Sequence, residues 1–209
     1  MNSPSLPVLA GVEHRFVDVG GGVTIHVADA GPADGSPVML VHGFPQNWWA
    51  WHELIGPLAA DGYRVLFWYQ IPISLPVIGP RLLSDPKGRF IRMTGRWVGA
   101  GFYLDDDDFR LYVRCMRLPG HAVAGSRWYR TFLTRELIRA GEFANTSVDV
   151  PMRFLHGVGD PVITPTLLRG YAEHADGFRL ETVDGVGHWV VDQRPELVLE
   201  RLRAFLHDT

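Results

Sequence analysis

Two short apolar runs, one helix length apart, do most to limit the fold of this chain. They are PVMLV at residues 37–41 and YRVLF at residues 63–67. Between them, residues 49–60 place Leu54 and Leu58 at the spacing of one helix face. Short apolar strands without polar alternation are typical of parallel sheets that are covered on both faces. A strand, a helix and a second strand in this order predict an α/β fold with a mostly parallel sheet.

Segments on either side of these runs supply further elements of the same kind. Residues 14–19 and 23–28 flank the glycines at 20–22, and this pattern predicts a β-hairpin. Residues 152–156 and 178–183 are also predicted to be strands. Helices are expected over residues 164–172 and 195–207. Core elements of an α/β domain therefore lie on both sides of the middle of the chain.

The middle of the chain, between residues 70 and 145, lacks this order of strand and helix. Its helical segments are expected at residues 80–93, 105–116 and 128–140. The carboxylates of Asp105–Asp108 favour a helix N-terminus, because its backbone N–H groups carry partial positive charge. This block predicts a helical cap inserted into the core. The expected domains are residues 1–67 for the N-terminal part of the core, 68–147 for the cap and 148–209 for the C-terminal part of the core.

Composition narrows the class of protein. A net charge of −3 does not point to nucleic acid or acidic membranes as partners. Cys115 is the one cysteine, and no Cys/His cluster has the spacing of metal ligands. The N-terminal residues lack a basic, apolar leader, and no apolar run approaches the ~20 residues that span a bilayer. We therefore expect a cytoplasmic protein with no metal or cofactor that binds neither nucleic acid nor membranes.

The loop after the first apolar strand is the first candidate site. A loop at the carboxyl end of a buried strand can present backbone N–H groups to an oxyanion, and Phe44 is the candidate donor. The alternative is a tight turn without function, since Gly and Pro occur in loops generally. The residues of this expected oxyanion loop are His42, Gly43, Phe44 and Pro45.

An acid and a histidine follow the last two expected strands. Asp160 comes after residues 152–156, and His188 follows residues 178–183 in the motif GVGHW. An acid at a strand end can orient a histidine from a neighbouring strand end. Taken singly, an Asp-Pro turn or a lone histidine is more often structural. An acid followed by a histidine in this context is the order in which α/β-hydrolases carry their triad.

Two tyrosines in aromatic contexts are the last candidates. Tyr69 lies in FWYQ, and Tyr129 lies in RWYR. Aromatic side chains in a helical block more often pack than react, so neither tyrosine indicates a function alone.

Together these motifs resemble the epoxide hydrolases of the α/β-hydrolase superfamily, which share a branch with haloalkane dehalogenases. The resemblance covers nearly the whole chain. It implies that Asp160 orients His188 and that His188 activates water. It further implies that Tyr69 and Tyr129 hydrogen-bond the epoxide oxygen and act as acids in ring opening. Finding both tyrosine contexts favours an epoxide hydrolase over a dehalogenase, which usually presents a Trp or Asn to the halide.

The nucleophile of that family has no counterpart in this sequence. Epoxide hydrolases carry an aspartate in the pattern G-x-D-x-G, whereas no Ser, Asp or Cys here occupies such a frame. At the junction of Leu66 and Phe67 the chain passes from a core strand to the cap, omitting roughly 60 residues or more. Strands 37–41 and 152–156 must then pair directly or expose apolar edges, at a cost of several kcal/mol at ~25 cal/mol per Å².

Two functional hypotheses remain open. The first is an epoxide hydrolase-like enzyme that hydrolyses a small apolar epoxide to a diol with little or no turnover. It would need a nucleophile from elsewhere, or His188 acting as a direct base on water. The second is an internally deleted, catalytically inactive hydrolase-like protein that at most binds a small apolar ligand.

Overall fold

The computed structural model divides into two compact units. It describes residues 6–20, 24–43, 46–61, 64–68, 78–99, 106–136, 139, 146–164, 168, 170 and 174–208. The first unit comprises Met1–Gly88 and Asp106–Tyr129, and the second comprises Arg89–Asp105 and Arg130–Thr209. The core and cap boundaries expected from the sequence stay a prediction, because this division follows contacts rather than function.

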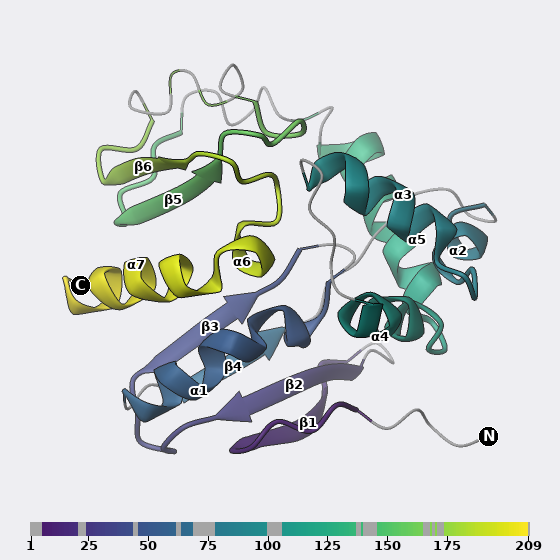
Figure 1. The fold of residues 1–209 in the computed structure, drawn as a ribbon, viewed down its shortest axis with the longest axis horizontal. Helices are drawn as coiled ribbons and strands as arrows, with labels where there is room; N and C mark the ends of the chain where they lie inside the picture. Colours follow the sequence, from purple (N-terminus) through teal and green to yellow (C-terminus); the bar gives the residue numbers. More distant parts are fainter. Residues whose placement is uncertain are drawn as a thin grey trace. The chain divides into compact units, whose positions relative to one another are not determined.

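A four-stranded sheet forms the base of the first unit (Figure 1). Strands β1 (Val12–Asp18) and β2 (Thr24–Ala30) form the predicted antiparallel hairpin. Strand β4 (Arg64–Trp68) pairs antiparallel with β2 and parallel with β3 (Pro37–Val41), so that the order is β1-β2-β4-β3. The parallel pair predicted from the two apolar runs is therefore present.

Strand β4 runs without a break through Leu66 and Phe67, where the sequence predicts that the nucleophile segment is omitted. Leu66 stands opposite Met39 and Phe67 stands opposite Leu40 in one continuous parallel register. The residues on the two sides of the junction thus share a single strand.

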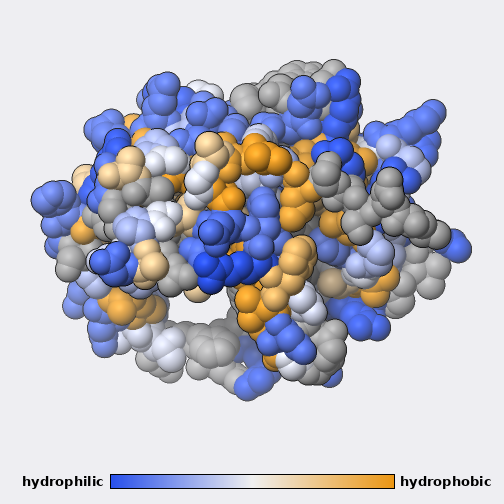
Figure 2. All heavy atoms as spheres, turned by 90° about the horizontal axis from the view of Figure 1, so that it is seen from below, coloured by the Kyte–Doolittle hydropathy of each residue, from blue (hydrophilic) through white to orange (hydrophobic). Residues whose placement is uncertain are grey.

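Strand β3 is covered on one face only. Val38 and Leu40 are buried, whereas Met39 is 64% exposed and Val41 is 52% exposed. The expectation of a strand buried on both faces is therefore wrong for β3. The reason is that β3 is the edge strand of its sheet, and among the described elements helix α1 (His52–Ala60) packs on the strands beside it. Figure 2 shows that apolar side chains also reach the surface elsewhere, among hydrophilic ones.

A short 3₁₀ helix, Trp48–Trp51, leads into α1, in agreement with the predicted helix over residues 49–60. Asn47 caps it, because the Asn47 side-chain oxygen accepts a hydrogen bond of 2.9 Å from the Trp49 N–H. Leu54, Ile55 and Leu58 then lie fully buried and anchor α1 to the sheet.

The helical insertion differs from the prediction in where its helices begin and end. The single helix expected over residues 80–93 is two helices, α2 (Ile78–Leu83) and α3 (Arg89–Val98). The helix is interrupted around Asp85, because the proline that follows disfavours helical backbone at that residue. Gly88 then adopts a positive φ of 57° before α3 begins. The remaining elements are α4 (Asp106–Met116), α5 (His121–Thr131) and a π-helical turn (Phe132–Glu136).

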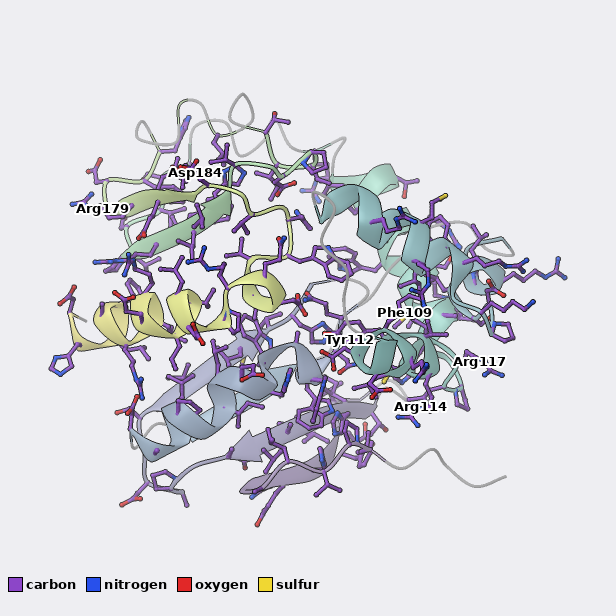
Figure 3. The ribbon with its side chains drawn as sticks, in the orientation of Figure 1. Phe109, Tyr112, Arg114, Arg117, Arg179 and Asp184 are labelled. Carbon is purple, nitrogen blue, oxygen red and sulfur yellow. The ribbon has the colours of Figure 1, made fainter. Side chains whose placement is uncertain are left out.

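Helix α4 has a buried face and an exposed stripe. Phe109 and Tyr112 are buried on its inner face, and Arg114 and Arg117 are exposed toward its C-terminal end (Figure 3). Helix α5 begins at His121, seven residues before the predicted start, because small residues line its buried face where large apolar residues would have marked a helix. They are Ala122, Gly125 and Ser126.

The second unit holds a pair of parallel strands, β5 (Met152–Gly157) and β6 (Phe178–Val183). Helices α6 (Val190–Gln193) and α7 (Pro195–His207) follow, and the bounds of α7 are those predicted. Arg201 of α7 holds Glu181 of β6 through two contacts of 2.8 Å from its Nε. Most of the helix predicted over residues 164–172 lies outside the described residues.

Strands β3 and β5 belong to separate sheets among the described strands. The direct pairing of these strands that the sequence leaves open stays a prediction. No helix in the described part of the chain is long and apolar enough to cross a bilayer.

Candidate active site

The carboxyl ends of β5 and β6 place an acid and a histidine side by side. Gly157, the last residue of β5, stands opposite Val183, the last residue of β6. The turn after β5 is closed by a hydrogen bond of 3.0 Å from the Asp160 N–H to the Gly157 carbonyl. His188 follows β6 after a loop of four residues.

Asp160 and His188 form a hydrogen-bonded pair with a fixed orientation. The Asp160 Oδ2 lies 2.8 Å from the His188 Nδ1. The Asp160 Oδ1 accepts from the backbone N–H groups of Val162 and Ile163, at 2.7 and 3.0 Å. Both carboxylate oxygens are therefore engaged, and the carboxylate plane is held from two sides.

The ionisation of Asp160 follows from the same contacts. Burial alone would raise its pKa, since the side chain is only 4% exposed. The hydrogen bonds from His188 and from the two backbone N–H groups outweigh burial and lower the pKa of Asp160 below its ordinary value. An ionised carboxylate can only accept a hydrogen bond, so the His188 Nδ1 carries the proton. The Nε2 lone pair of this half-exposed imidazole is then the basic position.

The backbone of the histidine loop is bound directly to the end of β5. The Gly159 N–H donates to the Val186 carbonyl at 2.8 Å. Gly157 lies so close to Val186 and Gly187 that a Cβ atom at position 157 would overlap their carbonyl oxygens. This requirement for glycine was not foreseen from the sequence, although a glycine at the end of a strand can mark a close backbone approach.

Gln193 is a second residue that sequence reasoning missed. Its side-chain oxygen accepts from the Gly187 N–H at 2.8 Å, directly beside His188. No short motif identifies this contact, because it depends on the one-turn helix that brings residue 193 back to residue 187.

The first unit holds the expected oxyanion loop at the end of β3. His42 is buried, and its Nδ1 lies 2.8 Å from the Gly43 carbonyl oxygen. Burial lowers the pKa of His42 to about 4, against the opposing effect of that hydrogen bond. A neutral His42 therefore serves the loop as a packed side chain. Phe44 and Pro45 lie outside the described residues, so the Phe44 N–H stays a predicted donor.

Contacts just after this loop bind it to α4 within the first unit. The Asn47 Nδ2 donates to the Cys115 Sγ at 3.3 Å. The Trp49 Nε1 donates to the Asp108 Oδ1 at 2.6 Å. Burial raises the pKa of Cys115 to about 11, so this thiol stays protonated and is not a hidden nucleophile.

Of the two candidate tyrosines, the structure describes Tyr129 but not Tyr69. Tyr129 lies in α5, where burial raises its pKa and where Trp128 packs edge-on at 5.4 Å between ring centroids. Tyr69 lies outside the described residues. The acid roles of both tyrosines stay predictions. Among the described residues, no group of three His, Cys, Asp or Glu side chains has the geometry of a metal site.

Comparison with known proteins finds similarity to hydrolases. No family model matches the chain. Over 127 residues, 60% of the chain and 39% of the relative, it is 30% identical to Epoxide hydrolase A of Mycobacterium tuberculosis. Over 56 residues it is 48% identical to the AB hydrolase superfamily protein YfhM of Bacillus subtilis, covering 27% of the chain and 19% of the relative.

This chain also resembles a solved structure in its fold. The crystal structure of Epoxide Hydrolase A from Mycobacterium thermoresistibile superposes with a TM-score of 0.79 and 18% identity, covering 94% of this chain and 98% of that one. At this identity the likeness shows the fold alone.

The matched segments span well under two thirds of the curated relatives. Since 127 residues make up 39% of the Mycobacterium tuberculosis protein, its length is about 325 residues, against 209 in this chain. A haloalkane dehalogenase of Mycobacterium marinum is 47% identical over a further short match of 56 residues, which covers 25% of this chain and 19% of that protein. The curated relatives thus include enzymes of two different chemistries.

Proposed function

We propose that this chain, an epoxide hydrolase-like α/β hydrolase, hydrolyses a small apolar epoxide to a diol by direct attack of a water molecule that His188 activates. The observation that supports this proposal is the oriented pair of Asp160 and His188 in a chain without a nucleophile motif. Such a pair can accept a proton from water even where no side chain is available to attack carbon.

The proposed reaction adds one water molecule in a single step. The water oxygen forms a bond to an epoxide carbon while the His188 Nε2 takes a water proton. The carbon–oxygen bond of the ring breaks, and its electron pair goes to the epoxide oxygen. Asp160 stabilises the imidazolium that forms. The epoxide oxygen takes a proton from Tyr129 or Tyr69, and the base returns its proton to the tyrosinate.

The raised pKa of Tyr129 is compatible with this role, because it keeps the phenol protonated near neutral pH. The expected rate is low. General base catalysis alone contributes about 10²–10⁴-fold, and the covalent route needs a nucleophile for which this sequence has no motif.

Hydrolysis of a styrene-oxide-type substrate tests the proposal. Wild type should exceed the uncatalysed rate, and His188→Ala should return to it. His207→Ala, in the exposed last turn of α7, is the matched control and should behave as wild type. Equal rates for wild type and His188→Ala would overturn the proposal.

Isotope labelling separates direct attack from a covalent route. In H₂¹⁸O and with enzyme in excess, direct attack places ¹⁸O in the diol during the first turnover. A covalent ester instead delivers unlabelled protein oxygen first. Unlabelled diol from a single turnover would show that the chain contains a nucleophile after all.

A second candidate function is binding without catalysis, which the missing nucleophile motif favours. In this case the chain binds a small apolar ligand and turns nothing over. Calorimetry with a non-reactive analogue of the epoxide, run beside the hydrolysis assay, distinguishes the two: binding without any rate that depends on His188 supports the second candidate.

A further inference from the structure

We propose that Gln193 is a positioning residue for His188 and that it ties the histidine loop to the end of α3. This inference rests on the proposed role of His188, but its test needs no turnover. All the residues concerned belong to the second unit.

Both ends of the Gln193 amide are engaged. Its Oε1 accepts from the Gly187 N–H at 2.8 Å, and its Nε2 donates to the Gly99 carbonyl at 3.2 Å. Gly187 directly precedes His188, and Gly99 directly follows α3. One side chain therefore links the histidine loop to Gly99, which lies 94 residues before Gln193 in the sequence.

The residue on the other side of His188 is held by the same helix. Trp189 is buried, and a Cβ atom at Gly95 of α3 would lie 3.2 Å from the Trp189 Cη2. The indole thus packs directly on the backbone of α3. Because both neighbours of His188 are fixed to α3, the backbone that carries the imidazole has little freedom to rotate.

This arrangement matters because the Asp160–His188 hydrogen bond is sensitive to small displacements. A shift of the loop by about 1 Å would lengthen the 2.8 Å contact beyond hydrogen-bonding range. The end of β5 restrains the loop at Val186, and Gln193 restrains it at Gly187. Gln193 therefore restrains the histidine loop at a residue that β5 does not hold by a hydrogen bond among the described contacts.

Two substitutions separate the two links. Gln193→Leu keeps the approximate size and removes both hydrogen bonds. Gln193→Glu keeps the acceptor for Gly187 but cannot donate to the Gly99 carbonyl. Glu196→Ala, in the exposed first turn of α7, is the control for a nearby surface change.

Nuclear magnetic resonance of the imidazole nitrogens, the Gly187 amide and the Gly99 carbonyl measures the result. In Gln193→Leu the His188 Nδ1–H signal should be lost or shifted, and the Gly187 amide should exchange about tenfold faster, as expected for one lost hydrogen bond. In Gln193→Glu the His188 signal and the slow Gly187 exchange should persist, and only the Gly99 carbonyl should shift. Glu196→Ala should match wild type in all three.

An unchanged His188 signal in folded Gln193→Leu would overturn the proposal. If that variant does not fold, Gln193→Glu decides: an unchanged Gly99 carbonyl would show that no link to α3 exists, whereas the predicted shift with an intact His188 signal supports it. Wild type without any turnover would defeat the proposed function but would leave these readouts intact. If turnover is measurable, Gln193→Leu should lower kcat at least tenfold with little change in KM.

Discussion

Gly157 lies against Gly187, so that a Cβ atom on the first residue would overlap the carbonyl oxygen of the second. This contact joins the turn that carries Asp160 to the loop that carries His188. The close backbone contact therefore fixes the distance between the Asp160 and His188 side chains. The hydrogen bond between them depends on that distance.

Gly157→Ala should destabilise the protein and separate the pair. Inserting one carbon into a closed contact costs about 1–3 kcal/mol, and the loop must move away from β5 to relieve it. Urea unfolding measures the loss, and the His188 Nδ1–H signal reports the separation. Gly56→Ala is the control, because position 56 is an exposed helical site with open space around its Cβ. It should raise stability by about 0.5–1 kcal/mol. Equal effects of the two substitutions would contradict this view of Gly157.

One buried histidine, His42, and one half-buried histidine, His26, should make the stability of the first unit fall in acid. Burial lowers the pKa of His42 to about 4, and burial together with the nearby His14 and His121 lowers that of His26 to about 4. The unfolded chain takes up these protons near pH 6.5, whereas the folded protein takes them up only near pH 4. Between these values the unfolded state binds more protons, so the unfolding free energy decreases as the pH falls.

Urea unfolding from pH 7 to pH 4 measures this decrease. His42→Gln should flatten part of it, while His207→Gln, in the exposed end of α7, should leave its slope unchanged. A wild-type unfolding free energy that stays constant down to pH 4 would mean that these histidines are not protected.

The elements that could be predicted from the sequence are those whose pattern is local. Strands β3 and β6 and helix α7 have the predicted bounds, because apolar periodicity and a proline at a helix start are visible within a few residues. The pairing of Asp160 with His188 could be anticipated only through the order of motifs in a known family. Their catalytic roles, like those of Tyr129 and Tyr69, stay predictions.

The remaining features depend on residues far apart in the chain. Gln193 acts on Gly99, and Gly157 is needed because of Gly187, so no short window contains either relationship. Whether β3 is covered on one face or two depends on its neighbours in the sheet. The apolar run PVMLV has the composition of a fully covered strand, yet the structure covers half of it.

Alanine substitution along β3 tests this one-sided burial. Leu40 is 6% exposed, so Leu40→Ala should cost about 2–5 kcal/mol of unfolding free energy. Met39 on the other face is 64% exposed, so Met39→Ala should stay within about 0.5 kcal/mol of wild type. The pair is matched, because neighbouring residues of one strand lose side chains of similar size. A large cost for Met39→Ala would mean that something covers this face in solution.

Substitution of two adjacent carboxylates at the start of α4 tests whether the hydrogen bond between Asp108 and Trp49 stabilises the protein. Asp108→Asn should cost about 1–3 kcal/mol, because it removes the charge from a half-buried hydrogen bond of 2.6 Å to the Trp49 indole. Asp107→Asn is the matched control: its side chain is exposed and pairs with Arg110 at the surface, where an ion pair contributes about 0–1 kcal/mol. Urea unfolding followed by tryptophan fluorescence compares the two. If Asp107→Asn costs as much as Asp108→Asn, the charge of the helix N-terminus rather than the bond to Trp49 accounts for the stability.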